Sequence, residues 1–107
     1  MTIKQEHMMD HIRELLSSLL LLEVTDPALK GVTITEVVLD RELEYANIYV
    51  NALGNDARQA EVMKGLKRAN GFLRRELGKR LRLRRVPALV FHWDVTLARG
   101  DAMEAKL

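Results

Sequence analysis

The sequence predicts an α+β domain in which helices cover one face of a three-stranded sheet. Apolar residues recur at helical spacing in the first 24 residues and again from about residue 56 to residue 83. Three short segments, rich in β-branched residues or alternating between apolar and polar ones, have the pattern of strands. The resulting order is helix, strand, strand, helix, helix, strand. A chain of 107 residues, 48% of them hydrophobic, suits a single domain with an ordinary core.

The first half of the chain predicts a helix followed by a hairpin. The helix runs from about Lys4 to Val24 and ends before Pro27, because a residue that precedes proline disfavours the α conformation. Val32–Leu39 is rich in β-branched residues, and Tyr45–Leu53 alternates between apolar and polar residues. The polar residues 40–44 between them form a turn, so the two strands should pair as a hairpin.

The second half predicts two further helices and a last strand. Val62, Leu66, Ala69, Leu73 and Leu77 follow helical spacing. Glycines at positions 71 and 78 interrupt this segment, and each costs up to about 1 kcal/mol relative to alanine inside a helix. We therefore expect two helices with a kink near Ala69-Asn70-Gly71. Proline 87 opens the final strand, in which apolar residues alternate from position 89 to position 97.

Charge is distributed very unevenly along the chain. Residues 64–85 contain ten Lys or Arg and one acid, Glu76, which gives +9. The first 63 residues contain five basic and eleven acidic groups, and residues 86–107 contain two and three, so the rest of the chain carries −7. Solvated helix faces usually mix the two signs. A segment with one acid among eleven charges therefore favours a polyanionic partner.

No pattern for catalysis, metal binding or membrane insertion is evident in the sequence. The absence of cysteine excludes disulfides and thiolate chemistry. No apolar run reaches the roughly 20 residues of a membrane span, and the N-terminus does not resemble a secretory signal, so we expect a cytoplasmic protein. His7 and His11 have the spacing of a metal-chelating pair, but Met8 stands where the metalloprotease pattern requires Glu. We expect no catalytic residue, metal, cofactor, small-molecule substrate or membrane contact.

The basic segment therefore supplies the candidate nucleic-acid contacts. Lysine and arginine three and four residues apart share a helix face. Arginine also binds phosphate with a two-pronged fork. The predicted RNA-binding residues are the cations of this segment and the three residues of the expected kink: Lys64, Lys67, Arg68, Ala69, Asn70, Gly71, Arg74, Arg75, Lys79, Arg80, Arg82, Arg84 and Arg85. Tyr45 and Tyr49 share one face of a strand and could stack on bases, although tyrosine also simply favours strands.

Three stretches of the chain resemble ribosome-binding factor A of bacteria. They are Glu23-Val24-Thr25-Asp26-Pro27 with the β-branched strand after it, residues 45–50 (YANIYV), and residues 66–94 (LKRANGFLRRELGKRLRLRRVPALVFHWD). The resemblance implies a KH-like fold of the type II arrangement. It also implies binding to the small (30S) ribosomal subunit during late maturation, with processing of the 16S rRNA precursor and importance in the cold. Family members carry Ala-x-Gly in place of the Gly-x-x-Gly loop of other KH domains, and this chain has Ala69-Asn70-Gly71.

The resulting expectation is one KH-like RNA-binding domain over residues 1–98 and a short tail over residues 99–107. We expect it to act as a monomer on the small ribosomal subunit and its 16S rRNA. The first helix carries only Lys4 and Arg13 as basic residues, fewer than is common in the family, so its contribution to binding is open. Two other classes of function are weighed against this one. A DNA-binding domain would share the basic helices, and a small nuclease could lack a local signature.

Overall fold

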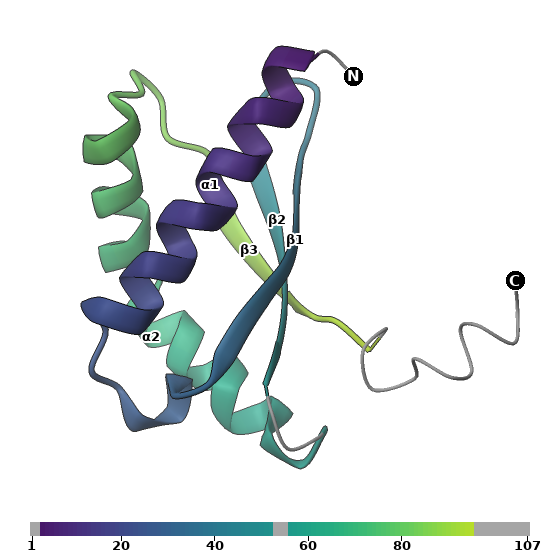
Figure 1. Ribbon diagram of the computed structural model, residues 1–107, viewed down its shortest axis with the longest axis vertical. Coiled ribbons are helices and arrows are strands. Elements are labelled where there is room, and N and C mark those ends of the chain that lie inside the picture. The colour runs from purple at the N-terminus through teal and green to yellow at the C-terminus, as the bar shows by residue number, and fades with distance from the viewer. Residues whose placement is uncertain (1–2, 53–55, 96–107) are drawn as a thin grey trace, which may run out of the picture.

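The computed structural model describes residues 3–52 and 56–95, and within them it contains two long helices and three strands (Figure 1). The elements are α1 (Ile3–Leu22), the 3₁₀ turn η1 (Pro27–Leu29), β1 (Val32–Leu39), β2 (Tyr45–Ala52), the 3₁₀ turn η2 (Asp56–Arg58), α2 (Gln59–Leu81) and β3 (Ala88–Trp93). This arrangement confirms the α+β class. The expected tail, residues 99–107, lies outside the described residues. Neither described helix combines the length and apolar character needed to cross a bilayer.

The strands form one mixed sheet in the order β1-β2-β3. β1 and β2 pair antiparallel, which confirms the predicted hairpin, and an irregularity in the register falls between Ile34 and Glu36. β2 and β3 pair in parallel, from Tyr45 opposite Ala88 to Val50 opposite Trp93. Parallel neighbours require a crossover connection, and α2 provides it (Figure 1).

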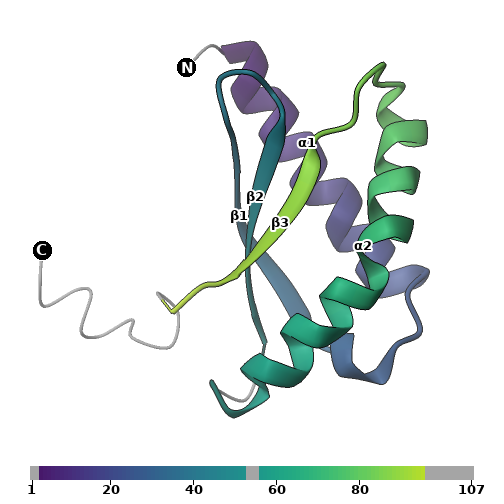
Figure 2. The ribbon, with the colours of Figure 1, turned by 180° about the vertical axis from the view of Figure 1, so that it is seen from behind.

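Both helices pack on the same face of the sheet, as predicted. The buried core joins Ile12, Leu16 and Leu19 of α1 and Leu66, Leu73 and Leu77 of α2 to the inward side chains of the strands, among them Ile34, Val37, Ile48, Val50 and Leu89. In Figure 2, seen from behind, the strands lie in front of α1. A two-layer domain of this kind agrees with the KH-like arrangement that the resemblance implies.

The two helices expected around Ala69-Asn70-Gly71 are a single helix, so the expected division is wrong, whereas the expected kink has a counterpart in a bend of that helix. α2 continues from Gln59 to Leu81, and its axis changes direction partway along (Figures 1 and 2). Tertiary packing explains the continuity, because buried residues recur on one side of α2 before and after Gly71. The penalty for a glycine inside a helix, about 1 kcal/mol, is smaller than the gain from burying several leucines.

The last strand is shorter than predicted. It ends at Trp93, whereas the alternation suggested strand to residue 97. Asp94 still donates its backbone N–H to the carbonyl of Val50 at 2.7 Å, and its own carbonyl accepts from the Asn51 side chain at 2.6 Å. A side chain thus replaces the backbone partner at the end of β3. Residues 96 and 97 lie outside the described residues.

Two glycines of α2 have opposite surroundings. A Cβ on Gly65 would lie 2.9 Å from Cδ2 of Leu29 and 3.1 Å from Cβ of Ala28, so η1 packs directly against the backbone of α2 there. A Cβ on Gly71 would meet no heavy atom within 4 Å. Of these two glycines, only Gly65 is therefore required by packing.

Gly71→Ala should raise the free energy of unfolding by up to about 1 kcal/mol, because alanine favours the helix and meets no obstacle. Gly65→Ala gains the same helix propensity but must displace η1, so we expect net destabilisation of about 1–3 kcal/mol. Urea titrations followed by circular dichroism measure both. A Gly65→Ala variant as stable as Gly71→Ala would contradict the close packing.

Asp26 ties η1 to α2 through both carboxylate oxygens. Oδ1 accepts a hydrogen bond from the N–H of Ala28 at 3.0 Å, and Oδ2 accepts from Nη2 of Arg68 at 2.8 Å. The Ala28 N–H, followed by the Arg68 guanidinium, holds the pKa of Asp26 below its usual value. A carboxyl with a lowered pKa stabilises the fold above its unfolded-state pKa of about 3.9.

The stabilisation by Asp26 should therefore be lost as pH falls from about 4 through the folded-state pKa. Asp26→Asn keeps a side chain that can cap η1 but removes the titrating group. Stability of the variant should decline less than that of the parent over this acidic range, as measured by urea titration at several pH values. Parallel declines would show that the Asp26 charge is not coupled to folding.

Candidate nucleic-acid interface

A stripe of exposed cations runs along the outer side of α2. Lys64, Lys67, Arg68 and Arg75 are all exposed and lie three, four or eleven residues apart, which places them on one helix face with the exposed Gly71 among them. The buried residues Val62, Leu66, Leu73 and Leu77 occupy the other side. The helix is thus divided lengthwise into an apolar side held by the core and a basic side turned outward. We call Lys64, Lys67, Arg68, Gly71 and Arg75 the basic stripe.

Gly71 leaves a gap in the middle of the basic stripe. Since a Cβ there would meet no atom within 4 Å, the helix backbone itself is accessible between the cations. The guanidinium carbon of Arg75 lies 6.0 Å from the centre of the Phe72 ring, so this cation rests on an aromatic face. A nucleic-acid backbone could approach α2 closely at this point.

Three of the sequence-predicted RNA-binding residues make contacts within the protein. Ala69 is 9% exposed and belongs to the core. Asn70 donates its side-chain amide to the carbonyl of Leu89 at 3.0 Å, and Arg74 donates to the carbonyl of Val86 at 2.8 Å. Asn70 and Arg74 thus secure β3 and the segment that leads into it. An RNA contact by Arg74 would have to use its other guanidinium nitrogens.

The remaining predicted cations lie at the end of α2 and in the loop that follows. Arg82 ends the helix in the left-handed conformation, with φ of 53°, and its N–H bonds to the carbonyl of Gly78. The loop then folds back over Gly78, where a Cβ would lie 2.5 Å from Cγ2 of Val86. Arg84 and Arg85 are exposed on this loop. A hollow of about 320 Å³ brings Arg80 and Arg82 next to Lys4, His7 and His11 of α1.

Three of the predicted cations already have carboxylate partners. Arg68 binds Asp26 through Nη2 at 2.8 Å, and Arg80 binds Glu23 at 2.6 Å. Glu76 lies 3.4 Å from Lys79 and 3.7 Å from Arg80. The helical spacing of Glu76 made its contacts visible in the sequence. Glu23 and Asp26 were missed as members of the site, because no local pattern links them to cations 57 and 42 residues away.

The uncovered face of the sheet carries a polar network and little positive charge. Tyr49 stacks on His92 with ring centres 4.9 Å apart, and His92 Nε2 lies 2.8 Å from Oδ1 of Asn47. Thr35 donates its hydroxyl to Asp94 and also contacts the carbonyl of Tyr49. One side of the Tyr49 ring is thus occupied from within, whereas Tyr45 is 50% exposed. Base stacking on these tyrosines stays a prediction, on a face distant from the basic stripe along α2.

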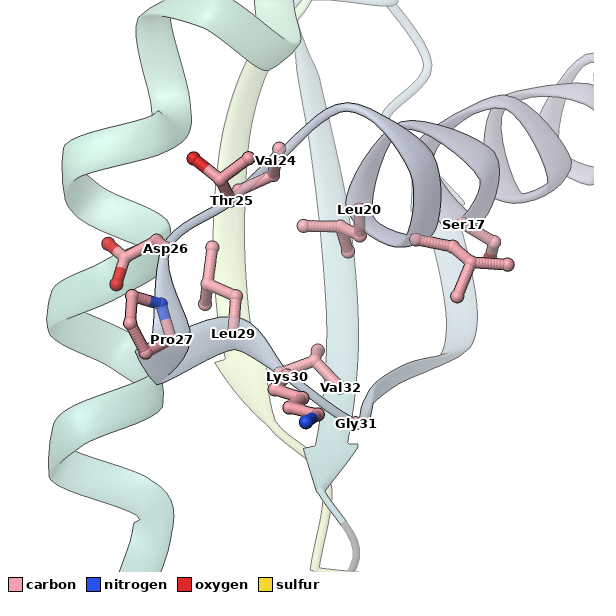
Figure 3. A pocket seen from close by; sticks show the side chains of 11 residues that line it. Ser17, Leu20, Val24, Thr25, Asp26, Pro27, Leu29, Lys30, Gly31 and Val32 are labelled. Atoms are coloured by element: carbon pink, nitrogen blue, oxygen red, sulfur yellow. The ribbon is translucent and has the colours of Figure 1, made fainter.

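The three histidines do not converge. His7 and His11 lie on the exposed side of α1, and His92 lies on β3. Beside the end of α1 there is a hollow of about 350 Å³, lined by apolar residues such as Leu20, Leu29 and Val32 (Figure 3). The figure also shows Asp26 directed toward α2. Neither place gathers three or more His, Asp or Glu side chains in the geometry of a metal site among the described residues.

Comparison with known proteins identifies the family. The family model for ribosome-binding factor A matches residues 4–107. The chain is 39% identical over 99 residues to ribosome-binding factor A of Natranaerobius thermophilus, a match that covers 92% of this chain and 76% of that one. It is 46% identical over 94 residues to the protein of that name from Microcystis aeruginosa, with 86% and 73% covered.

Solved structures agree with these matches. The crystal structure of ribosome-binding factor A from Thermus thermophilus superposes with a TM-score of 0.74 at 26% identity, covering 82% of this chain and 92% of that one. The solution structure of a Thermotoga maritima protein described as a ribosome binding factor A superposes with the same TM-score at 35% identity, covering 81% and 83%. The chain described here belongs to the ribosome-binding factor A family.

Proposed function

We propose that this protein binds the RNA of the small ribosomal subunit through the basic stripe of α2. The observation that carries the proposal is the stripe itself, with its four exposed cations on one side of a helix whose other side is fixed in the core. A rise of 1.5 Å per residue gives at most about 16 Å between Lys64 and Arg75. Phosphates follow each other by about 3.4 Å along one strand of a duplex, so the stripe can meet several of them.

Recognition by this surface depends on RNA shape and phosphate positions more than on base sequence. The chain has Ala69-Asn70-Gly71 and no Gly-x-x-Gly loop for clamping single-stranded RNA. The side chains that project outward from the stripe are lysine and arginine, which suit phosphate. The cations of the following loop, Arg82, Arg84 and Arg85, extend the contact beyond the helix. Asn70 and Arg74 position β3 beneath it.

The biological role that we propose is late maturation of the small (30S) subunit, including processing of the 16S rRNA precursor, with particular importance in the cold. The protein acts as a cytoplasmic monomer by binding energy alone, without a catalytic step or cofactor. A family relative supports this partner: a homology model of the Thermus thermophilus ribosome binding factor A has been fitted into a cryo-electron microscopy map of a 30S complex of that factor. The same partner for this chain is an inference from family membership.

The affinity for small-subunit RNA should fall linearly with salt on logarithmic axes, because each phosphate contact releases counterions. The double variant Lys67→Ala/Arg75→Ala should weaken binding to many RNA sequences and flatten the slope by about 1–2. Filter binding at several salt concentrations measures both. The matched control is Lys30→Ala/Arg41→Ala, which removes two exposed cations that do not belong to α2.

If the two double variants weaken RNA binding equally, the affinity depends on the net charge of the protein and not on the position of the basic stripe. Duplex DNA, tested at one fixed salt concentration, separates RNA binding from the DNA-binding alternative. Tighter binding to DNA than to structured RNA would overturn the proposed partner. Incubation of ribosomal RNA with the protein, with and without divalent metal, tests for a nuclease.

A tagged copy of the protein should sediment with immature small subunits and be scarce on large subunits and translating ribosomes. A maturation factor must prefer the unfinished particle, since a ligand with equal affinity for two states shifts neither. Cells that lack the protein should accumulate precursor 16S rRNA and grow poorly in the cold. Sucrose gradients and RNA analysis test this. Sedimentation mainly with polysomes, or normal processing at low temperature, would refute the role.

A further inference from the structure

Two cations of α2 differ from their neighbours because the segment between α1 and η1 holds them. Oδ2 of Asp26 accepts from both Nε and Nη2 of Arg68, at 3.0 and 2.8 Å. Oε2 of Glu23 accepts from Nη2 of Arg80 at 2.6 Å. For Lys64, Lys67 and Arg75, no carboxylate oxygen lies within 4 Å in the part of the chain that the structure describes. We call the basic stripe together with Arg80 the basic surface. It thus contains cations with and without an internal carboxylate partner.

The carboxylate of Asp26 is fixed in place. Its second oxygen caps η1 through the Ala28 N–H at 3.0 Å, and its side chain is only 22% exposed, compared with 59% for Arg68. η1 in turn packs against α2 at Gly65, where a Cβ would meet Leu29 at 2.9 Å. Figure 3 shows Asp26 directed from this segment toward α2. The Ala28 N–H and then Arg68 hold its pKa below the usual value, so the group stays ionised at neutral pH.

Ion pairing changes what these two arginines can contribute to RNA binding. A guanidinium binds carboxylate and phosphate by the same hydrogen-bonding geometry, so an RNA phosphate must replace the carboxylate. The gain from that exchange is smaller than the gain at an unpaired cation, and the released carboxylate repels a poorly placed phosphate. An unpaired lysine, by contrast, attracts any polyanion.

We propose that Glu23 and Asp26 determine the RNA specificity of the basic surface. The two carboxylates keep Arg68 and Arg80 ion-paired, so most RNA molecules do not contact these arginines. An RNA whose phosphates are fixed at the right positions displaces both carboxylates and binds the two arginines. Non-specific binding then depends on the unpaired cations alone, and the structured target gains two additional arginine contacts. This inference rests on the proposed RNA-binding function and assigns a role to acids that flank the basic helix.

The test is the double variant Glu23→Gln/Asp26→Asn, which removes two charges with little change of shape. Asparagine can still cap η1. The matched control is Glu14→Gln/Glu36→Gln, which removes the same charge at two exposed positions outside α2 that have no ion pair among the described residues. Binding is measured to a short poly(U) strand and to purified immature small subunits, over a range of salt concentrations.

The double variant should bind poly(U) several-fold more tightly than the control variant does. Its salt dependence should steepen by up to about 1.4, since each added phosphate contact on a single strand contributes about 0.7. Its affinity for immature subunits should change less, so the ratio between the two affinities should fall. The single variant Glu23→Gln removes the nearer carboxylate partner of Arg80 and leaves the longer Glu76 contact and η1 intact. It should give an intermediate result and covers the case in which the double variant folds poorly.

Equal binding of poly(U) by the double variant and the control variant would overturn the inference while leaving the proposed function standing. Weaker binding by the double variant would also overturn it, because the carboxylates would then contact RNA directly. If the parent protein binds neither RNA, the proposed function itself fails. The two failures are therefore distinguishable in one set of titrations.

Discussion

The burial of one side of α2 determines the orientation of the cations in the basic stripe. Val62, Leu66, Leu73 and Leu77 are fully buried, and full burial of such a side chain stabilises the fold by about 1.5–3 kcal/mol. With this side fixed, residues about half a turn away must point to solvent. The sequence places lysine, arginine and one glycine there. A surface that meets RNA by shape needs cations in constant positions, and a helix anchored along its length provides them.

Because β2 and β3 pair in parallel, α2 also serves as the crossover connection between them. The chain must cross the sheet between these strands and return, so the residues after α2 have to turn sharply into β3. Arg82 adopts the left-handed conformation, Gly78 admits Val86, and Arg74 and Asn70 bond to carbonyls of the returning segment. Some polar residues of α2 therefore hold the chain that leads into β3. Their bonds shape the loop on which Arg84 and Arg85 are exposed.

Periodicity predicted the elements well, because each depends on contacts that a short segment makes with the core. Helical spacing gave α1, and β-branching and alternation gave the hairpin. The division into two helices near Gly71 was wrong because local propensity is weaker than the burial of Leu66, Leu73 and Leu77 around it. The charge run located the candidate interface. The charge run did not show that Arg68 is ion-paired whereas Lys67 is not. The partner of Arg68 is the Asp26 carboxylate, 42 residues away in the sequence, and only the packing of η1 onto α2 brings the two together.

The close approach of η1 to α2 therefore connects the fold to the RNA recognition that we propose. Gly65 has no side chain, so Ala28 and Leu29 can pack against α2. This packing fixes the position along α2 at which the Asp26 carboxylate binds Arg68. A mobile acid would act on the basic surface only as diffuse negative charge, screened over about 10 Å at 0.1 M salt. A carboxylate that caps a turn acts at one position and competes for one guanidinium. Selectivity for an RNA with phosphates at defined positions then follows from the rigidity of the competitor as much as from the cations themselves.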